Sequence, residues 1–299
     1  MKIHIMIAIL CGLLIVVSGC GTAQKDTLRF GIIAPSINHL PLSYAQTSGD
    51  SLNIARFSSG WEVQEALIAG KIDAAIMPFS YAWNAASKGY PIRIVSFLEH
   101  ESDGIVVQPE IQKIHDLHNA KIGVLKASTV ELLMDDLAQT YGLEYHAVYF
   151  RTPNDLVSAL HTRDVDAIVA YVPVIQKISE NYQVLHWFGE SHPEHPCCDL
   201  VVNKKNMSPA KISELRKLIA RIHGALPHIA TREEKLVSAT QSMYQLSLEQ
   251  TEEALANTFY TTGLDPAGKA MERRLIEIAV QKGYQGTMIK DEDIYWELP

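Results

Sequence analysis

The chain has 299 residues, of which 47% are hydrophobic and 20% charged, with 17 glycines and 13 prolines. This composition is that of a packed globular protein, and it excludes a disordered or collagen-like chain. The 26 basic and 34 acidic residues give a formal net charge of −8, and no run of lysine or arginine forms the basic surface that nucleic acid requires. We therefore expect no nucleic-acid partner, and one large domain or two ordinary ones that fold without disulfides.

The N-terminal residues have the pattern of an export signal. An apolar stretch at 3–17 follows the positive charge of Lys2 and ends in small residues directly before Cys20. Such a stretch is typical of a secretory signal peptide and is shorter than the roughly 20 residues of a membrane-spanning helix. The cysteine after small residues resembles a bacterial lipobox. We expect residues 1–19 to be removed, Cys20 to be lipidated, and 20–26 to tether the body to the cell or outer membrane, facing the periplasm or exterior.

The body of the chain contains the same unit twice. Residues 52–61 align with 145–154 at an offset of 93, and the same offset places Asp73 on Asp166. Upstream strands align at an offset of 92, and the apolar runs further downstream align at 95. Each copy is therefore about the size of a small domain.

In chain order, each copy predicts strand, helix, strand, helix, strand. Apolar residues at helical spacing, such as Val63 and Leu67 in the first copy and Val130 and Leu137 in the second, predict the helices. Another apolar strand follows in each copy, and then a strand that we expect to cross between the lobes as the hinge. Short β-branched runs predict strands at 28–34, 53–57, 73–77, 92–97, 104–108, 121–125, 146–150, 166–170, 183–188 and 199–203.

The C-terminal third predicts helices with recognisable starts. Ser208 before Pro209 is a cap followed by a first-turn proline, and Asp265 before Pro266 repeats this pattern. Ser247 with a glutamine three residues later forms a capping box. We therefore expect helices to begin at these three places.

The alternation of strands and helices predicts an α/β fold with two doubly wound lobes, each a parallel sheet covered by helices on both faces. We expect lobe 1 at 27–107, lobe 2 at 108–200, and a return to lobe 1 with C-terminal helices at 201–299. Doubly wound sheets bind ligands at the carboxyl ends of their strands, so two facing lobes make a cleft. The sequence therefore predicts a hinged binding protein that closes on a small solute.

Several short motifs carry a family resemblance over nearly the whole body. Their order resembles the solute-binding proteins of ABC importers, in the type II periplasmic binding protein branch for sulfonate, taurine, nitrate and thiamine-pyrimidine precursors, which includes fungal pyrimidine synthases. The resemblance implies an extracytoplasmic monomer that delivers a small solute to an ABC permease. The matching residues are Asn38, His39, Pro41, Ala45, Gln46, Phe57, Ser58, Ser59, Gly60, Ala66, Leu67, Gly70, Asp73, Pro78, Ser80, Lys88, Gly89, Tyr90, Pro91, Lys126, Ala127, Ser128 and Thr129.

Candidate ligand-binding residues gather where strands end. At two such ends, free backbone N–H groups and hydroxyls would hold an anionic or strongly polar group, although the same hydroxyls also serve as helix caps. Aromatic residues after the third strand of each copy would stack on a solute or pack in the core, and His39 is a candidate because of its family match. The candidates are His39, Ser58, Ser59, Gly60, Phe79, Ser80, Ser128, Thr129 and Tyr171.

The adjacent Cys197 and Cys198 allow three interpretations: a strained vicinal disulfide, thiols that line the cleft, or a soft-metal site with His192 and His195. The spacing is unlike that of a structural zinc site, and the pyrimidine synthases have a cysteine-rich motif near this position. We therefore place Cys197, Cys198 and Asp199 in the solute site.

Enzyme chemistry is disfavoured. The synthases bind pyridoxal phosphate through a lysine near a histidine, but residues 74–87 contain neither. We expect a receptor without a cofactor or a resident metal. The alternative is a metal-binding lipoprotein that uses His192, His195, Cys197 and Cys198. A second and weaker alternative is a sensor domain, which would need a transmembrane or kinase segment downstream.

Overall fold

The computed structural model describes residues 27–45 and 52–299. The expected signal peptide, Cys20 and the tether at 20–26 lie outside these ranges. Within the described residues, no helix is both long and apolar enough to cross a membrane.

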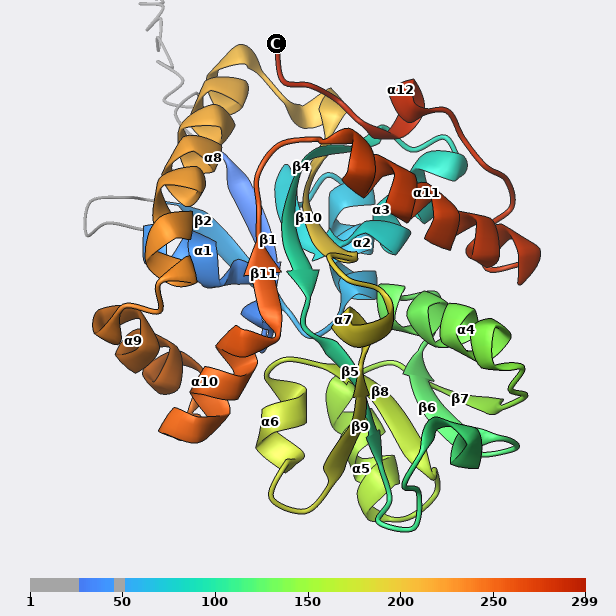
Figure 1. Cartoon of the computed structure of the whole chain (residues 1–299). Helices are drawn as coiled ribbons and strands as arrows, with labels where there is room; N and C mark the ends of the chain where they lie inside the picture. The colour runs from blue at the N-terminus through green and yellow to red at the C-terminus, as the bar shows by residue number, and fades with distance from the viewer. Residues whose placement is uncertain (1–26, 46–51) are drawn as a thin grey trace, which may run out of the picture.

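The first lobe is built on a six-stranded sheet with the order β11-β4-β10-β3-β1-β2 (Figure 1). Helix α8 packs on one face, where Leu215 and Leu218 meet Phe30 and Leu200. Helices α2, α3 and α11 cover the other face. The elements are β1 (Arg29–Ile33), α1 (Leu40–Ala45), β2 (Asn53–Phe57), α2 (Gly60–Ile68), β3 (Ala74–Pro78), α3 (Phe79–Ser87), β4 (Ile92–Glu101), β10 (Pro196–Asn203), α8 (Pro209–Ala230), α9 (Glu234–Tyr244), α10 (Leu248–Ala256), β11 (Thr258–Tyr260), α11 (Pro266–Gln281) and α12 (Asp291–Ile294), with short 3-10 helices at Ile37–His39 and Lys204–Asn206.

The second lobe is built on a five-stranded sheet with the order β7-β6-β8-β5-β9. Helix α5 buries Leu156 and Leu160 against one face of this sheet, and α4 covers the other. Its elements are β5 (Asp103–Val107), a 3-10 helix at Ile114–Leu117, β6 (Lys121–Leu125), α4 (Thr129–Tyr141), β7 (His146–Phe150), α5 (Pro153–His161), β8 (Ala167–Tyr171), α6 (Val174–Ile178), β9 (Gln183–Trp187) and α7 (Phe188–Ser191).

Every predicted strand is present, and the three predicted helix starts are confirmed. Ser208 accepts a hydrogen bond from the backbone of Lys211 at the start of α8, and Asp265 caps α11 in the same way. Ser247 forms the expected capping box with Gln250 at α10. Local sequence signals therefore fixed these elements.

The two copies exchange a strand. β5 follows β4 along the chain but pairs with β8 and β9 in the second sheet, whereas β10 follows β9 but pairs with β3 and β4 in the first. Both exchanged strands are antiparallel to their neighbours, while β1, β2 and β3, like β6, β7 and β8, run parallel. The prediction of wholly parallel sheets is therefore wrong, because a strand that returns from the other lobe enters from the opposite end.

The exchange also moves the expected lobe boundaries. The chain crosses first at Glu101 and Ser102, which have φ values of 63° and 75°, and again between β9 and β10, around α7. Residues 104–108 and 199–203, expected to be the hinge, lie mainly inside the sheets. The first lobe therefore ends before residue 103 rather than at 107, and the return begins at 196 rather than after 200.

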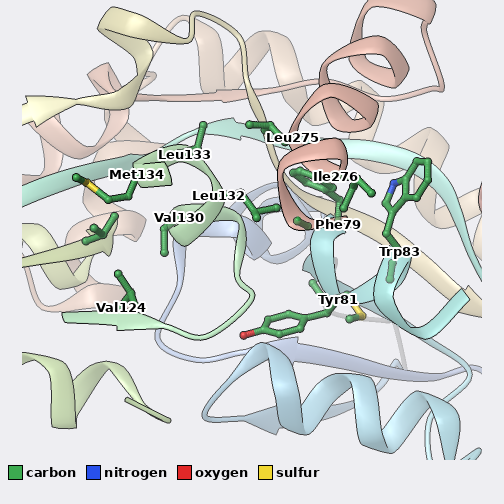
Figure 2. Close-up of a cluster of buried hydrophobic side chains, with 14 of the residues drawn as sticks. Phe79, Tyr81, Trp83, Val124, Val130, Leu132, Leu133, Met134, Leu275 and Ile276 are labelled. Carbon is green, nitrogen blue, oxygen red and sulfur yellow. The ribbon is translucent and has the colours of Figure 1, made fainter. Parts of the chain in front are cut away.

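One apolar cluster continues across the two lobes. Figure 2 shows Ile276 of α11 beside Phe79 and Trp83 of α3, and Leu275 of α11 on the side of Leu133 of α4. Helix α11 of the first lobe therefore packs on α4 of the second.

Charged contacts reinforce this packing. Arg274 of α11 lies 2.7 Å from Asp136 of α4, and Lys282 lies 2.9 Å from Asp135. The same Asp136 carboxylate lies 2.6 Å from Nε2 of His192, in the second crossing. Asp136 thus joins α4, α11 and the hinge.

The two copies repeat one detail of their strand starts. Asp73 and Asp166 each donate their backbone N–H to the first residue of the adjacent strand, Arg29 or Lys121, over 2.8 Å. Each carboxylate also accepts the backbone N–H of that residue, over 3.0 and 2.8 Å. Only Asp73 is fully buried, and it also pairs with the side chains of Arg29 and Lys211.

This difference gives a matched pair of variants. We expect Asp73→Asn to lower the free energy of unfolding by about 2–3 kcal/mol, because Arg29 and Lys211 lose the buried carboxylate with which they pair. The value is kept at this level because Arg29 is 38% exposed, so solvent already weakens its ion pair. Asp166→Asn should cost less than about 1 kcal/mol, because its carboxylate is exposed and keeps an amide oxygen as acceptor. Urea unfolding measures both, and equal losses would contradict this account.

Candidate ligand-binding cleft

A cavity of about 720 Å³ lies between the lobes. It is lined at the carboxyl ends of the parallel strands, where such sheets bind ligands. The final residues of β1, β3, β6, β7 and β8 all line it: Ile33, Pro78, Leu125, Phe150 and Tyr171. Both lobes thus contribute walls, as does Ser102 of the first crossing.

Of the twelve candidate binding residues, seven line this cleft and five do not. Those on the cleft wall are Ser59, Gly60, Ser128, Thr129, Tyr171, Cys197 and Cys198. Those elsewhere are His39, Ser58, Phe79, Ser80 and Asp199.

The first four of these outliers have local explanations. His39 is buried with its ring edge against Tyr244, and burial lowers its pKa to about 4, helped by the positive charge of Arg56. Phe79 and Ser80 begin α3 and are buried, while the next residue, Tyr81, lines the cleft. Figure 2 shows the Phe79 and Tyr81 side chains pointing in different directions. Ser58 is exposed and hydrogen-bonds the Glu62 carboxylate.

Asp199 faces the core of the first lobe instead of the cleft. It is fully buried near Glu272, and burial together with that second carboxyl raises the pKa of Asp199 well above its ordinary value. Glu272 accepts hydrogen bonds from Trp83 Nε1 and Tyr295 Oη over 2.8 and 2.9 Å, and burial raises its pKa to about 7. The buried pair therefore keeps protons at pH values where exposed carboxyls have lost theirs.

The helix N-termini at the cleft carry their own carboxylates. Ser59 and Ser128 cap α2 and α4 by accepting the backbone N–H of Glu62 and Glu131. Each glutamate then reaches back to the loop before its helix, Glu62 to Ser58 N and Glu131 to Ala127 N. A negative side chain at this position offsets the positive end of the helix dipole. These N-termini are therefore poorer anion sites than free ones.

The floor of the cleft is acidic and thiol-rich. Glu99 and Asp103 are each 1% exposed, and Cys197 and Cys198 lie beside them. Burial, with the nearby Asp103, raises the pKa of Glu99 to about 8. Burial also raises the pKa of Cys198 to about 11. Glu99 and the Cys198 thiol are therefore largely protonated at neutral pH.

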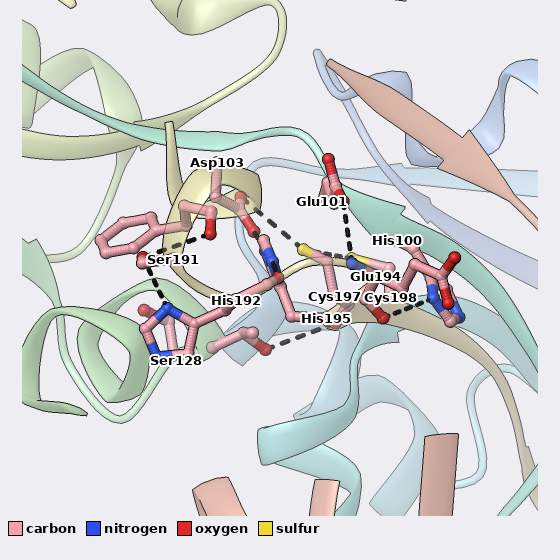
Figure 3. A network of polar contacts seen from close by, with 12 residues as sticks. His100, Glu101, Asp103, Ser128, Ser191, His192, Glu194, His195, Cys197 and Cys198 are labelled. Carbon is pink, nitrogen blue, oxygen red and sulfur yellow. Dashed lines mark hydrogen bonds and ion pairs between the residues drawn. The ribbon is translucent and has the colours of Figure 1, made fainter. Parts of the chain in front are cut away.

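The two histidines near the cysteines have other partners. His192 Nε2 contacts Asp136, and His195 places Nδ1 2.8 Å from the backbone oxygen of His192 and Nε2 3.3 Å from Asp103. Figure 3 shows His192 beside Ser191 and His195 beside Asp103, together with the contact from Cys197 to Asp103. Among the described residues, the two histidines of the alternative four-residue metal set do not join the cysteines in one group of possible ligands, because both imidazoles have other partners in the second crossing.

Sequence reasoning missed the aromatic rim of the cleft. Trp61 from the first lobe is 54% exposed and Tyr149 from the second is 46% exposed, and both line the cavity. Lys126 Nζ lies 5.2 Å from the Tyr149 ring centre. Tyr81 joins the lobes by donating its hydroxyl to the backbone oxygen of Lys126 over 3.1 Å. The available signal was an aromatic residue close to a strand end: Tyr149 lies one residue before the end of β7, and Trp61 lies four residues after the end of β2.

Two α/β lobes that exchange strands around a cleft define the class of two-lobed proteins with the periplasmic binding protein fold. The family model described as NMT1/THI5 like matches residues 41–221, which is more than half of the chain. The chain therefore belongs to the NMT1/THI5-like family. The predicted family resemblance is confirmed.

Relatives of known structure or name support the same class. The taurine-binding periplasmic protein of Escherichia coli K12 is 24% identical over 176 residues, which is 51% of this chain and 55% of that protein. The chain thus spans about half the length of this curated relative.

Solved structures share the fold over nearly the whole chain. The ligand-binding component of an ABC-type import system from Staphylococcus aureus, solved with zinc bound, has a TM-score of 0.78 at 17% identity, covering 91% of this chain and 97% of that one. The alkanesulfonate-binding protein SsuA from Xanthomonas axonopodis, bound to MOPS, has a TM-score of 0.79 at 15% identity, covering 91% and 98%. The periplasmic aliphatic sulphonate-binding protein SsuA from Escherichia coli has a TM-score of 0.76 at 17% identity, covering 92% of this chain and 93% of that one.

The buried carboxyl pair predicts how stability depends on pH. Because the pKa of Glu272 is raised to about 7, the folded chain keeps a proton that the unfolded chain loses at lower pH, so stability falls as the pH rises from about 4.5 through 7. Glu272→Gln removes this titration and gives Asp199 an amide donor. Between pH 5 and 8, the melting temperature of this variant should fall less than that of the wild type. The difference between the two falls should be at least about 2–4 °C, which corresponds to about 1 kcal/mol in the free energy of unfolding. Glu277→Gln, on the exposed face of the same helix, is the control and should follow the wild type; equal slopes for both variants would refute the assignment.

Proposed function

We propose that this protein is the lipid-anchored, extracytoplasmic solute-binding component of an ABC importer. The observation that carries the proposal is a cavity of about 720 Å³ at the strand ends of two lobes joined by two crossings. A cleft of this kind binds a small molecule and closes by rotation about the crossings. The receptor acts as a monomer and hands its solute to an ABC permease, without catalysing a reaction.

The charges of the cleft favour some solutes over others. The candidates from the sequence were a thiamine-pyrimidine precursor, a sulfonate and a nitrate-like anion. Glu62 and Glu131 already occupy the two helix N-termini, and the floor holds Glu99 and Asp103. A small anion at either helix N-terminus would meet the carboxylate of Glu62 or Glu131 instead of free N–H groups, which disfavours sulfonate and nitrate at these two places.

The aromatic residues of the cleft favour a flat, ring-shaped solute. Trp61 and Tyr149 approach from opposite lobes, and Tyr81 and Tyr171 line the same cavity, so a flat ring can be held between aromatic faces. The cations Lys88, Lys126 and Arg151 that line the cleft are all exposed, unlike the buried acidic floor. This arrangement suits a heterocycle with amino or hydroxyl groups toward the floor and any anionic substituent at the mouth.

A binding series tests the solute class. An aminopyrimidine should bind to the purified body of the protein, while taurine and nitrate at the same concentrations should not. Trp61→Ala and Tyr149→Ala should each weaken binding by about 2–10-fold, the value of one aromatic contact. Phe259→Ala, which removes an aromatic ring that is 52% exposed and outside the cleft, should have no effect.

Calorimetry gives the affinities, and X-ray scattering should show a smaller radius of gyration with the aminopyrimidine bound. Tighter binding of taurine than of the aminopyrimidine would reverse the solute assignment. An unchanged radius at saturation would contradict closure.

The anchor needs a separate test because Cys20 lies outside the described residues. Cys20→Ser should leave the protein unlipidated and release it from washed membranes, with the melting temperature of the body unchanged. Cys11→Ser, within the apolar stretch, is the matched control and should be processed normally. Membrane fractionation with mass spectrometry of the N-terminal peptide measures both, and full retention of unlipidated Cys20→Ser would rule out this anchor.

A further inference from the structure

Two neighbouring residues of β10 face the same cavity, which a regular strand does not allow because successive side chains point to opposite faces. The pairing of β10 with β4 shifts register between Pro196 and Cys198 and again between Cys198 and Asp199. This bulge turns both Cys197 and Cys198 to the cleft, with their Sγ atoms 3.8 Å apart. Bulges often re-aim side chains next to functional sites.

The separation of the two sulfur atoms matches a metal geometry. Zinc binds thiolate sulfur at about 2.3 Å, and a tetrahedral angle then separates two sulfur ligands by about 3.8 Å. Glu99 of β4 is paired with Cys198 across the ladder. Its carboxylate oxygen and the two Sγ atoms all lie within 4.8 Å of one another. Three ligand atoms are thus already gathered around one point.

The surroundings of this group are those of an incomplete polar site. Among the described residues, Oε1 of Glu99 has no hydrogen-bond partner although Glu99 is 1% exposed. A buried carboxyl oxygen without a partner is costly, and a cation would satisfy it.

The second layer around the sulfur atoms is ordered. Asn38 donates its Nδ2–H to Cys198 Sγ over 3.4 Å, and Asp103 lies 3.7 Å from Cys197 Sγ while its other oxygen faces His195. Outer partners of this kind orient metal ligands. His195 therefore acts through Asp103, as a positioning residue and not as a ligand.

From these observations we propose that the floor of the cleft binds a zinc ion through Cys197 Sγ, Cys198 Sγ and the Glu99 carboxylate. The mixed set favours zinc, because copper(I) prefers sulfur alone and magnesium or calcium prefers oxygen alone. All three ligands line the cavity, so the fourth tetrahedral position faces the cleft and takes water or a nitrogen donor of the solute. Only this last contact rests on the proposed function.

Metal titration of the reduced, metal-free protein under anaerobic conditions tests the site without any solute. Zinc in competition with a chromophoric chelator should bind at roughly one equivalent. Cobalt(II) should give the sulfur-to-metal absorption and the visible bands of a tetrahedral thiolate site. Cys197→Ser with Cys198→Ser should abolish both signals, and Glu99→Gln should weaken zinc binding by at least about 10-fold, the least that loss of a partner in a metal site costs.

Two further comparisons separate a ligand from a structural residue. Glu99→Gln removes a buried carboxyl, so the metal-free variant should melt at or above the wild-type temperature while it loses zinc; a merely structural Glu99 predicts a lower melting temperature with unchanged zinc affinity. His192→Ala, the control from the first predicted metal set, should keep zinc affinity within about twofold, since a removed ligand would cost at least about tenfold.

Zinc binding that survives in the double cysteine variant, or that is lost equally in His192→Ala, would overturn the proposal. So would the absence of binding to the reduced wild type. Aminopyrimidine titration of the metal-free protein is measured independently, so failure of the solute assignment and failure of the metal site give different results.

Discussion

β5 and β10 each lie inside the sheet that the other copy of the repeat builds, and the hinge, the cleft and the packing between the lobes all depend on this exchange. A strand hydrogen-bonded on both sides cannot leave its sheet without breaking two ladders. Each lobe therefore requires a strand from the other half of the chain, and neither half is a complete folding unit. The two crossings are consequently short and meet at the cleft floor, where Ser102, Asp103 and Cys197 gather.

The elements could be predicted from the sequence because their signals are local. The internal repeat aligned the sequence of β2 with that of β7, and the capping residues Ser208, Ser247 and Asp265 predicted where three helices start. Which strands pair is a different question, because hydrophobic periodicity identifies a strand but not its neighbour. The antiparallel entry of β5 and β10 had no local signal, so the lobe boundaries were misplaced by a few residues.

The candidate site was predicted in part, for a similar reason. Strand ends identified Ser59 and Ser128 on the cleft wall. Phe79 and Asp199 were misplaced because the direction of a side chain depends on the first turn of a helix or on a bulge. The acidic floor was missed because Glu99 lies in β4 beyond the predicted strand at 92–97, and the sequence gives no sign that this strand reaches a cavity.

The contacts of Asp136 have a mechanical consequence. This carboxylate lies on α4 of the second lobe and meets Arg274 of α11 and His192 of the second crossing. Burial lowers the pKa of His192, so Arg274 is the charged partner of Asp136. Any rotation of one lobe against the other changes the distances from Asp136 to Arg274 and to His192, so these contacts help to set the resting angle of the two lobes without touching the solute. The Arg274 side chain is exposed, so dissolved salt weakens its attraction to Asp136. The fraction of receptor molecules in the conformation that can close, and with it the apparent affinity for the solute, therefore varies with ionic strength.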